Sequence, residues 1–353
     1  MPTASPTLIP TPTSPPVPTP VSIIELGGAS VAPGFSLTLF AEVYRPTALV
    51  FDTEGRLYAA SADGKVYRIG DVDQDRRGDG VTEFASGFVT PLGIAFRPET
   101  DEFFVSFQGQ ISAIRDADGD GIAEESRVVI SGLPFGRHQN DNLKFGPDGW
   151  LYMGVGSTCD ACYEADARSA TILRIHPDTG ESEIFASGMR NPFDLAFHPL
   201  TGDLFATDNG RDDLGLDEPQ EELNHIVQGG DYGFPNCWNL LEGPDCEGTI
   251  PAIAFFESHS SADGVAIYDG DAFPDEYRYN AFVVIFGSWL KTVQTGVVRV
   301  VLTPNGDTYT AHTEWLVQFP EGVMPLPITV GPDGALYVGD YINSKIYRIS
   351  YGP

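Results

Sequence analysis

Two short polar runs stand directly before predicted strands and contain residues suited to acid–base chemistry. His138 lies in GRHQNDNLKFGPDG, and Arg190 and Asn191 lie in SGMRNPFDLAF. A neutral imidazole is a suitable general base near pH 7, and an Arg-Asn pair offers fork-like donors to a planar anion or carbonyl. Because both runs enter a strand of the same kind, we expect these side chains on one face of the fold. Taken singly, a surface histidine and a surface arginine without a role are the simpler interpretations.

Two more polar residues occupy comparable loops later in the chain. His259 lies in ESHSSADG, and Lys291 lies in GSWLKTVQTG. Three other histidines lie in predicted strands or strand-end turns, and no chemical role is predicted for them: His176, His198 and His312.

Two Asp-rich loops, DVDQDRRGDG and DADGDGIAEE, are candidate calcium sites. Asp116, Asp118 and Asp120 follow one another at every second position and precede a glycine, as at the start of a calcium loop. The twelfth position is Arg127, where an EF-hand needs a bidentate glutamate, and flanking helices are not predicted. Calcium binding of another kind and a solvated acidic turn both remain open.

Four cysteines form two local pairs, Cys159 with Cys162 and Cys237 with Cys246. The gap between the pairs is far longer than in a zinc ribbon, and a redox C-x-x-C motif is usually found where a strand leads into a helix. We therefore predict two local disulfides, which are typical of an oxidising compartment. A zinc site and free thiols are the alternatives.

A repeated phrase organises the chain: an apolar strand, a turn with glycine, and a strand reading Leu-Tyr or similar. Copies include ALVFDTEGRLYAAS, NLKFGPDGWLYMGVG and ITVGPDGALYVGD. Three or four strands per ~40–50 residues are typical of propeller blades, and the alternation has the period of a strand. Six copies predict an all-β, six-bladed β-propeller. The corresponding position in each copy, which we call its anchor, is 45, 49, 52, 70 and 63 residues from the one before. The anchors are Phe51, Phe96, Phe145, Phe197, Ile267 and Val330.

The two ends of the predicted propeller are expected to meet. The run SLTLFAE, residues 36–42, is a spare strand before the first full copy. Pairing it with the strand near Lys345–Ser350 would close the ring and remove two exposed sheet edges.

Composition restricts the possible partners and divides the chain. With 20 Lys+Arg, 50 Asp+Glu and a formal charge of −30, the chain would repel nucleic acid and anionic membranes. No apolar run reaches the ~18 residues of a transmembrane helix, so no membrane insertion is predicted. Residues 1–23 are Pro/Thr-rich and predict a disordered tether, whereas residues 24–353 predict one folded domain.

Three runs together resemble a known family: HQNDNLKFGPDGWLYMGVG, SGMRNPFDLAFHP and EELNHIVQGGDYGFPNC. They are similar to the quinoprotein sugar dehydrogenases of the soluble glucose and L-sorbosone dehydrogenase type, over roughly residues 35–350. That family is a six-bladed propeller that binds pyrroloquinoline quinone (PQQ) and calcium on one face. The resemblance implies that His138 removes the substrate hydroxyl proton, that Arg190 stabilises charge on the quinone, and that Asn191 holds the cofactor.

The resemblance also implies further site residues. Cofactor contacts are expected at Asn209, His259 and Lys291, and a cofactor-side calcium at the backbone carbonyls of Gly210 and Arg211. A second, structural calcium is expected at Glu222 and Tyr232.

The chain departs from the glucose-type pattern at several positions. Met324 and Leu326 stand where those members have two arginines, and Phe88 or Val89 replaces a glutamine. Where the family has two aspartates near the catalytic histidine, this chain has Arg137 and Ser157. A tricarboxylate cofactor would therefore meet fewer cationic partners here, and the sorbosone-type branch is the closer likeness.

The leading hypothesis is an extracytoplasmic PQQ- and calcium-dependent dehydrogenase acting on an aldose or a sorbosone-like aldehyde. Such an enzyme also needs an external electron acceptor. The alternatives are a non-catalytic propeller that binds a glycan or protein, and a calcium-dependent, lactonase-like hydrolase. A nicotinamide site is not predicted, because no G-x-G-x-x-G follows a strand.

Overall fold

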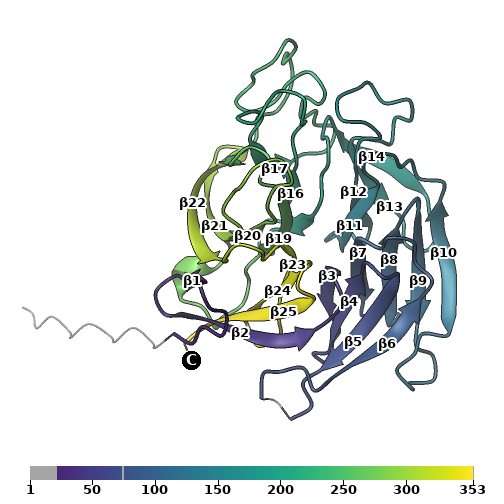
Figure 1. The fold of residues 1–353 in the computed structure, drawn as a ribbon. Helices are drawn as coiled ribbons and strands as arrows, with labels where there is room; N and C mark the ends of the chain where they lie inside the picture. Colours follow the sequence, from purple (N-terminus) through teal and green to yellow (C-terminus); the bar gives the residue numbers. More distant parts are fainter. Residues whose placement is uncertain (1–21, 74, 353) are drawn as a thin grey trace, which may run out of the picture.

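The structure is a computed structural model that describes residues 22–73 and 75–352 (Figure 1). The predicted tether therefore lies almost wholly outside the described residues. Within them, the chain forms six antiparallel sheets and one short 3-10 turn, η1 (Asp275–Tyr277). None of the described segments is a helix long and apolar enough to cross a lipid bilayer. The predicted all-β, six-bladed propeller is confirmed.

The sheets follow the chain in order as blades. The first three blades contain β3 (Pro46–Phe51), β4 (Leu57–Ser61), β5 (Lys65–Gly70), β6 (Gly80–Ser86), β7 (Gly93–Arg97), β8 (Glu102–Phe107), β9 (Gln110–Arg115), β10 (Glu125–Ser131), β11 (Asn140–Phe145), β12 (Leu151–Val155), β13 (Thr171–Ile175) and β14 (Ser182–Ser187). The last three contain β15 (Leu195–Phe197), β16 (Leu204–Asp208), β17 (Glu221–Ile226), β18 (Ala254–Phe256), β19 (Ala262–Ile267), β20 (Ala281–Ile285), β21 (Gly296–Asn305), β22 (Thr308–Gln318), β1 (Ser30–Val31), β23 (Pro325–Val330), β24 (Leu336–Asp340), β25 (Lys345–Tyr351) and β2 (Phe35–Glu42).

The ring closes through the N-terminal strand. β2 is the outermost strand of the sixth blade and pairs antiparallel with β25, with Leu37 opposite Ile349. This is the pairing that the spare strand predicts. The inner strands β3, β7, β11, β15, β19 and β23 contact one another in a complete circle around the channel (Figure 1). Five of the six repeat anchors line the end of that channel opposite the candidate site described below: Phe96, Phe145, Phe197, Ile267 and Val330.

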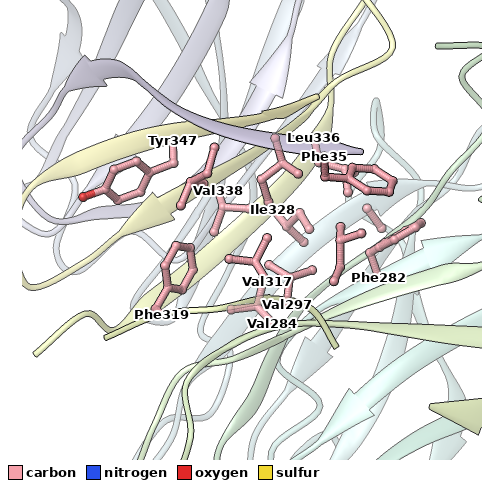
Figure 2. Close-up of a cluster of buried hydrophobic side chains, with 14 of the residues drawn as sticks. Phe35, Phe282, Val284, Val297, Val317, Phe319, Ile328, Leu336, Val338 and Tyr347 are labelled. Carbon is pink, nitrogen blue, oxygen red and sulfur yellow. The ribbon is translucent and has the colours of Figure 1, made fainter. Parts of the chain in front are cut away.

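The hydrophobic core lies between neighbouring blades. Figure 2 shows one layer, in which Phe282 and Val284 of β20 face Ile328 and Leu336 of the sixth blade. Phe35 of β2 joins the same layer, so the closing strand is packed as well as hydrogen-bonded. Burial of these large side chains stabilises each blade contact, at roughly 1.5–3 kcal/mol per fully buried side chain.

Several inner strands are irregular where they begin. The ladder register shifts between Asn140 and Leu143, and again between Ala262 and Val265. Such bulges bend a strand and redirect its side chains. They place the preceding polar loops at one end of the channel, which is where the candidate site lies.

Candidate functional site

One cavity gathers most of the predicted site residues. It has a volume of about 490 Å³ and lies where the loops that precede the inner strands meet. His138 and the Arg190-Asn191 pair enter it from the third and fourth blades, as the sequence predicts for residues on one face. Its lining comprises Arg137, His138, Arg190, Asn191, Asn209, Gly210, Asp212, Glu221, His259, Ser261, Phe286, Gly287, Ser288, Trp289 and Leu290.

His138 is held as a neutral base with one free ring nitrogen. Its Nδ1 lies 3.0 Å from Ser157 Oγ, and Ser157 Oγ donates its own proton to the carbonyl of Cys159 at 2.7 Å. The hydroxyl oxygen is then left to accept a proton from Nδ1, so Nε2 carries the lone pair. Burial, followed by the positive charges of Arg190 and Arg137, lowers the pKa of His138 to about 3. The imidazole is therefore uncharged at physiological pH.

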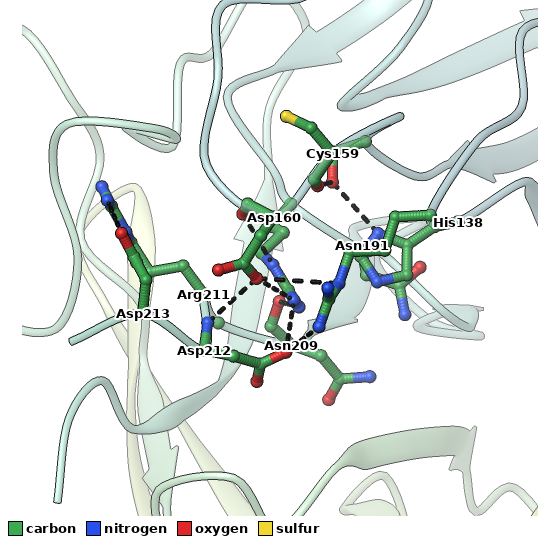
Figure 3. Close-up of polar contacts among 12 residues, drawn as sticks. His138, Cys159, Asp160, Asn191, Asn209, Arg211, Asp212 and Asp213 are labelled. Carbon is green, nitrogen blue, oxygen red and sulfur yellow. Dashed lines mark hydrogen bonds and ion pairs between the residues drawn. The ribbon is translucent and has the colours of Figure 1, made fainter. Parts of the chain in front are cut away.

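Arg190 is buried and largely committed to protein partners (Figure 3). Its Nε donates to the carbonyl of Asp160 at 3.0 Å, and Nη1 donates to the carbonyl of Asn209 at 3.1 Å. Nη2 contacts the carboxylates of Asp160 at 2.7 Å and Asp212 at 3.0 Å. Arg137 forms ion pairs with the same two carboxylates. Two arginines and two aspartates thus balance their charges at one edge of the cavity.

Two amide side chains in the wall of the large cavity have unpaired oxygens. The Oδ1 atoms of Asn191 and Asn209 are buried and have no hydrogen-bond partner. Asn209 is fixed because its Nδ2 donates to Asp263 at 2.7 Å. Asp208 accepts the backbone N–H groups of Arg190 and Asn191 at 3.1 and 2.7 Å, which holds the Arg-Asn turn in place. Unsatisfied buried amide oxygens in a cavity wall are suited to a polar ligand.

The remaining cofactor candidates differ in placement. His259 lines the cavity, with Nε2 2.6 Å from the carbonyl of Gly215 and Nδ1 3.4 Å from the carboxylate of Asp212. Lys291 is not part of the cavity lining; its Nζ lies 3.3 Å from a carboxylate oxygen of Glu257. The structure therefore brings His259 to the other candidates but leaves Lys291 at their margin.

A second, smaller cavity of about 30 Å³ adjoins the first and contains the predicted metal-binding residues. Gly210 lines both cavities, and Arg211, Glu222 and Tyr232 line the small one together with Asp208. Such a volume holds a single ion or water molecule.

The small cavity has an acidic wall. Burial, followed by the negative charge of Asp208, raises the pKa of Glu222 to about 8. Burial also raises the pKa of Asp208 to about 7. The phenolic oxygen of Tyr232 is already used, because it donates to the carbonyl of His225 and accepts from the N–H of Val227. Only the backbone oxygen of Tyr232 is left for a cation.

The second Asp-rich loop forms a cluster with one more carboxylate than its sequence spacing suggests. Carboxylate oxygens of Asp116, Asp118, Asp120 and Glu124 lie within 4.8 Å of one another. The first loop brings Asp71, Asp73 and Asp79 together in the same way, and both clusters lie mostly exposed on the blades' outer loops.

Sequence reasoning missed the acidic groups that surround the basic residues. Asp160, Asp212 and Glu221 were not singled out, although Asp160 stands inside the C-x-x-C motif. Glu221 is buried, its Oε2 accepts the backbone N–H of Gly210 at 2.7 Å, and burial raises its pKa to about 8.

Both predicted disulfides, Cys159–Cys162 and Cys237–Cys246, are confirmed.

An apolar cluster contains Met324 and Leu326, two positions at which the sequence departs from the glucose-type pattern. Leu326 packs with Phe193 and Phe286, and Met324 and Tyr341 contact this group. Because Phe286 also lines the large cavity, one wall of the cavity is apolar while the wall near His138 is polar. Such a division suits a flat ligand with an oxygen-rich edge.

Comparisons with known proteins identify the family and several relatives of the chain. A family model described as a domain of unknown function, DUF7133, matches residues 25–348. An uncharacterized protein of Borreliella burgdorferi is 30% identical over 200 residues, covering 52% of this chain and 53% of that protein. The aldose sugar dehydrogenase YliI of Escherichia coli is 24% identical, covering 64% of each chain. Quinoprotein glucose dehydrogenase B of Acinetobacter calcoaceticus is 23% identical, covering 56% of this chain and 52% of that enzyme.

A solved structure shares the fold. The holo form of the pyranose dehydrogenase PQQ domain from Coprinopsis cinerea superposes with a TM-score of 0.78 at 14% identity, covering 94% of this chain and 100% of that one. The matched part of the chain covers about half of the Borreliella protein and of quinoprotein glucose dehydrogenase B, and just under two thirds of YliI.

Proposed function

The chain belongs to the DUF7133 family and resembles quinoprotein sugar dehydrogenases, and on this premise we propose that it oxidises a sugar with PQQ and calcium. The observation that carries the proposal is the cavity in which His138, with a free lone pair on Nε2, lies beside Arg190, Asn191 and Asn209. A base, a guanidinium and unsatisfied amides in one cavity are the groups that a protein would contribute to alcohol oxidation, with a bound cofactor as the hydride acceptor.

The cavity residues fit a flat, oxygen-rich cofactor. The amide of Asn191 can turn either its nitrogen or its oxygen to a ligand, because its Oδ1 has no partner. Phe286 offers an apolar surface to a ring. Arg137 and Arg190 supply hydrogen-bond donors in the cavity wall, where Asp160 and Asp212 balance their charges, and Lys291 stands at the margin.

Each residue would have a defined task. When bound, PQQ would supply a hydride acceptor and calcium would supply a Lewis acid. His138 Nε2 takes the proton of the sugar hydroxyl, and Ser157 keeps the ring in the tautomer that allows this. Arg190 and the two asparagines bind cofactor oxygens, with His259 as a further contact. The backbone carbonyls of Gly210 and Arg211 hold the cofactor-side calcium.

The small cavity supports a second, structural calcium. It combines the carboxylates of Glu222 and Asp208 with room for one ion, and calcium prefers such oxygen ligands. A cation there would relieve the repulsion between the two buried carboxylates and allow both to ionise. The backbone oxygen of Tyr232 would complete one side of the site.

The substrate class is a small sugar, either an aldose or a sorbosone-like aldehyde, and an external acceptor would reoxidise the cofactor. Two disulfides support an oxidising, extracytoplasmic location.

Reconstitution tests the proposed function. We expect the protein, incubated with PQQ and calcium, to show the absorbance of a bound quinone and to reduce a dye when an aldose is added. The His138→Gln variant is the matched control, which should bind quinone without reducing the dye. Absence of quinone binding at millimolar PQQ and calcium would refute the proposal and favour a non-catalytic binding propeller.

A further inference from the structure

The loop of residues 157–164 touches both proposed catalytic side chains. Ser157 accepts the Nδ1 proton of His138, and its backbone N–H donates to the carbonyl of Arg190 at 2.7 Å. Asp160, in the same loop, accepts from Arg190 through both its backbone carbonyl and its carboxylate. Figure 3 shows Asp160 with Cys159 and Asp212, and the backbone N–H of Asp212 also donates to the Asp160 carboxylate at 3.1 Å.

The contacts of Arg190 leave it a single free donor. A guanidinium carries five N–H groups. Nε uses one on Asp160, Nη1 uses one on Asn209, and Nη2 uses two on Asp160 and Asp212. One N–H of Nη1 remains, and Arg190 lines both the large and the small cavity, so it can offer a ligand at most one donor rather than a two-pronged fork.

The loop itself is closed twice. The Cys159–Cys162 disulfide brackets Asp160. Glu164 accepts from the backbone N–H and the hydroxyl of Thr158 at 2.8 and 2.6 Å, which ties the two ends of the loop together. A short cross-linked loop loses little further entropy when it holds a partner, so it can fix Asp160 firmly.

We propose that the disulfide-bonded loop 157–164 is a positioning device, in which Asp160 fixes the guanidinium of Arg190 so that one N–H is left for a ligand. The Cys159–Cys162 bond fixes Asp160 in turn. The inference rests on the proposed dehydrogenase function for its catalytic meaning, but the orientation of Arg190 is testable without any cofactor. Asp160 is a positioning residue, because it acts on the cofactor only through Arg190.

Nuclear magnetic resonance of protein labelled with ¹⁵N-arginine tests the orientation. The guanidinium signals of Arg190, assigned by their loss in Arg190→Gln, should be separate and slow to exchange with water. Asp160→Ala should merge the Nη signals and speed their exchange by roughly tenfold or more. Asp160→Asn should do so less, because its side-chain oxygen still accepts. Asp213→Asn is the matched control, since Asp213 pairs with Arg211 instead.

A second measurement joins the orientation to catalysis. With PQQ and calcium, we expect Asp160→Ala and the double variant Cys159→Ser/Cys162→Ser to lower kcat roughly tenfold while KM changes less than twofold. Unchanged Arg190 signals in Asp160→Ala would overturn the proposal, and so would altered signals with an unchanged kcat. If the unmodified protein binds no quinone, the dehydrogenase function fails, while the signals still decide whether Asp160 holds Arg190.

Discussion

At the scale of single residues, His138 carries the chemistry that the proposed function needs. Replacing it with Gln keeps a polar side chain of similar size but removes the lone pair that accepts the hydroxyl proton. We expect turnover to fall by roughly 10²–10⁴, the usual contribution of a general base, while quinone affinity stays within a few-fold. Steady-state kinetics and a quinone titration measure the two effects. Equal loss of turnover and of quinone affinity would instead assign His138 to cofactor binding.

The same residue predicts a pH dependence of stability. The pKa of His138 is about 3 in the folded protein, against about 6.5 in an unfolded chain. Between these values the unfolded chain binds the extra proton, so acidification from pH 6.5 towards pH 3 destabilises the fold by up to about 1.4 kcal/mol per pH unit. We expect the free energy of unfolding to fall more steeply in the wild type than in His138→Gln. Parallel curves from urea unfolding would contradict this.

At the scale of elements, the closing strand β2 should be a main determinant of stability. Leu37 is fully buried between β2 and its neighbours, and Leu37→Ala should cost roughly 2–5 kcal/mol of unfolding free energy. Thr38→Ala, on the partly exposed face of the same strand, is the control and should cost much less. Urea unfolding measures both. Similar losses for the two variants would mean that the strand contributes hydrogen bonds rather than packing.

The segments that frame the small cavity predict a response to calcium. If calcium binds there, a chelator should lower the melting temperature, because an ion at a hundredfold excess over Kd stabilises the native state by about 2.7 kcal/mol. Glu222→Gln should abolish the response, whereas Glu124→Gln, in the exposed Asp-rich loop, should preserve it. A response lost only in Glu124→Gln would move the calcium to the outer loop.

At the scale of the whole molecule, the formal charge of −30 should select the electron acceptor. A strongly acidic surface attracts cations over a Debye length of about 30 Å at 0.01 M salt and about 3 Å at 1 M. We therefore expect a cationic dye to be reduced at least tenfold faster than an anionic dye of similar potential at low salt. The difference should shrink at high salt. Equal rates at low salt would show that electron transfer does not depend on the molecular field.

The sequence alone determined the architecture, because its signals are local and repeated. The alternation of Leu-Tyr strands and glycine turns specifies each blade, and six copies specify the ring. The spare strand at residues 36–42 identified the closure, since an unpaired edge needs a partner. The disulfides were predictable for the same reason, because each pair is close in sequence. The position of each loop within the repeat also indicated that His138 and Arg190 share a face.

Only the tertiary structure decided the electrostatic state of the site. The partners of Arg190 are Asp160 and Asp212, which stand 30 and 22 residues away, and no local pattern connects them. Ser157 sets the tautomer of His138 across a strand pair, and burial gives the carboxyls of Glu221 and Glu222 their raised pKa values. Hydrogen-bond saturation and desolvation depend on how loops from separate blades pack together, so the sequence pointed to His138 and Arg190 as candidates but could not show how each is held.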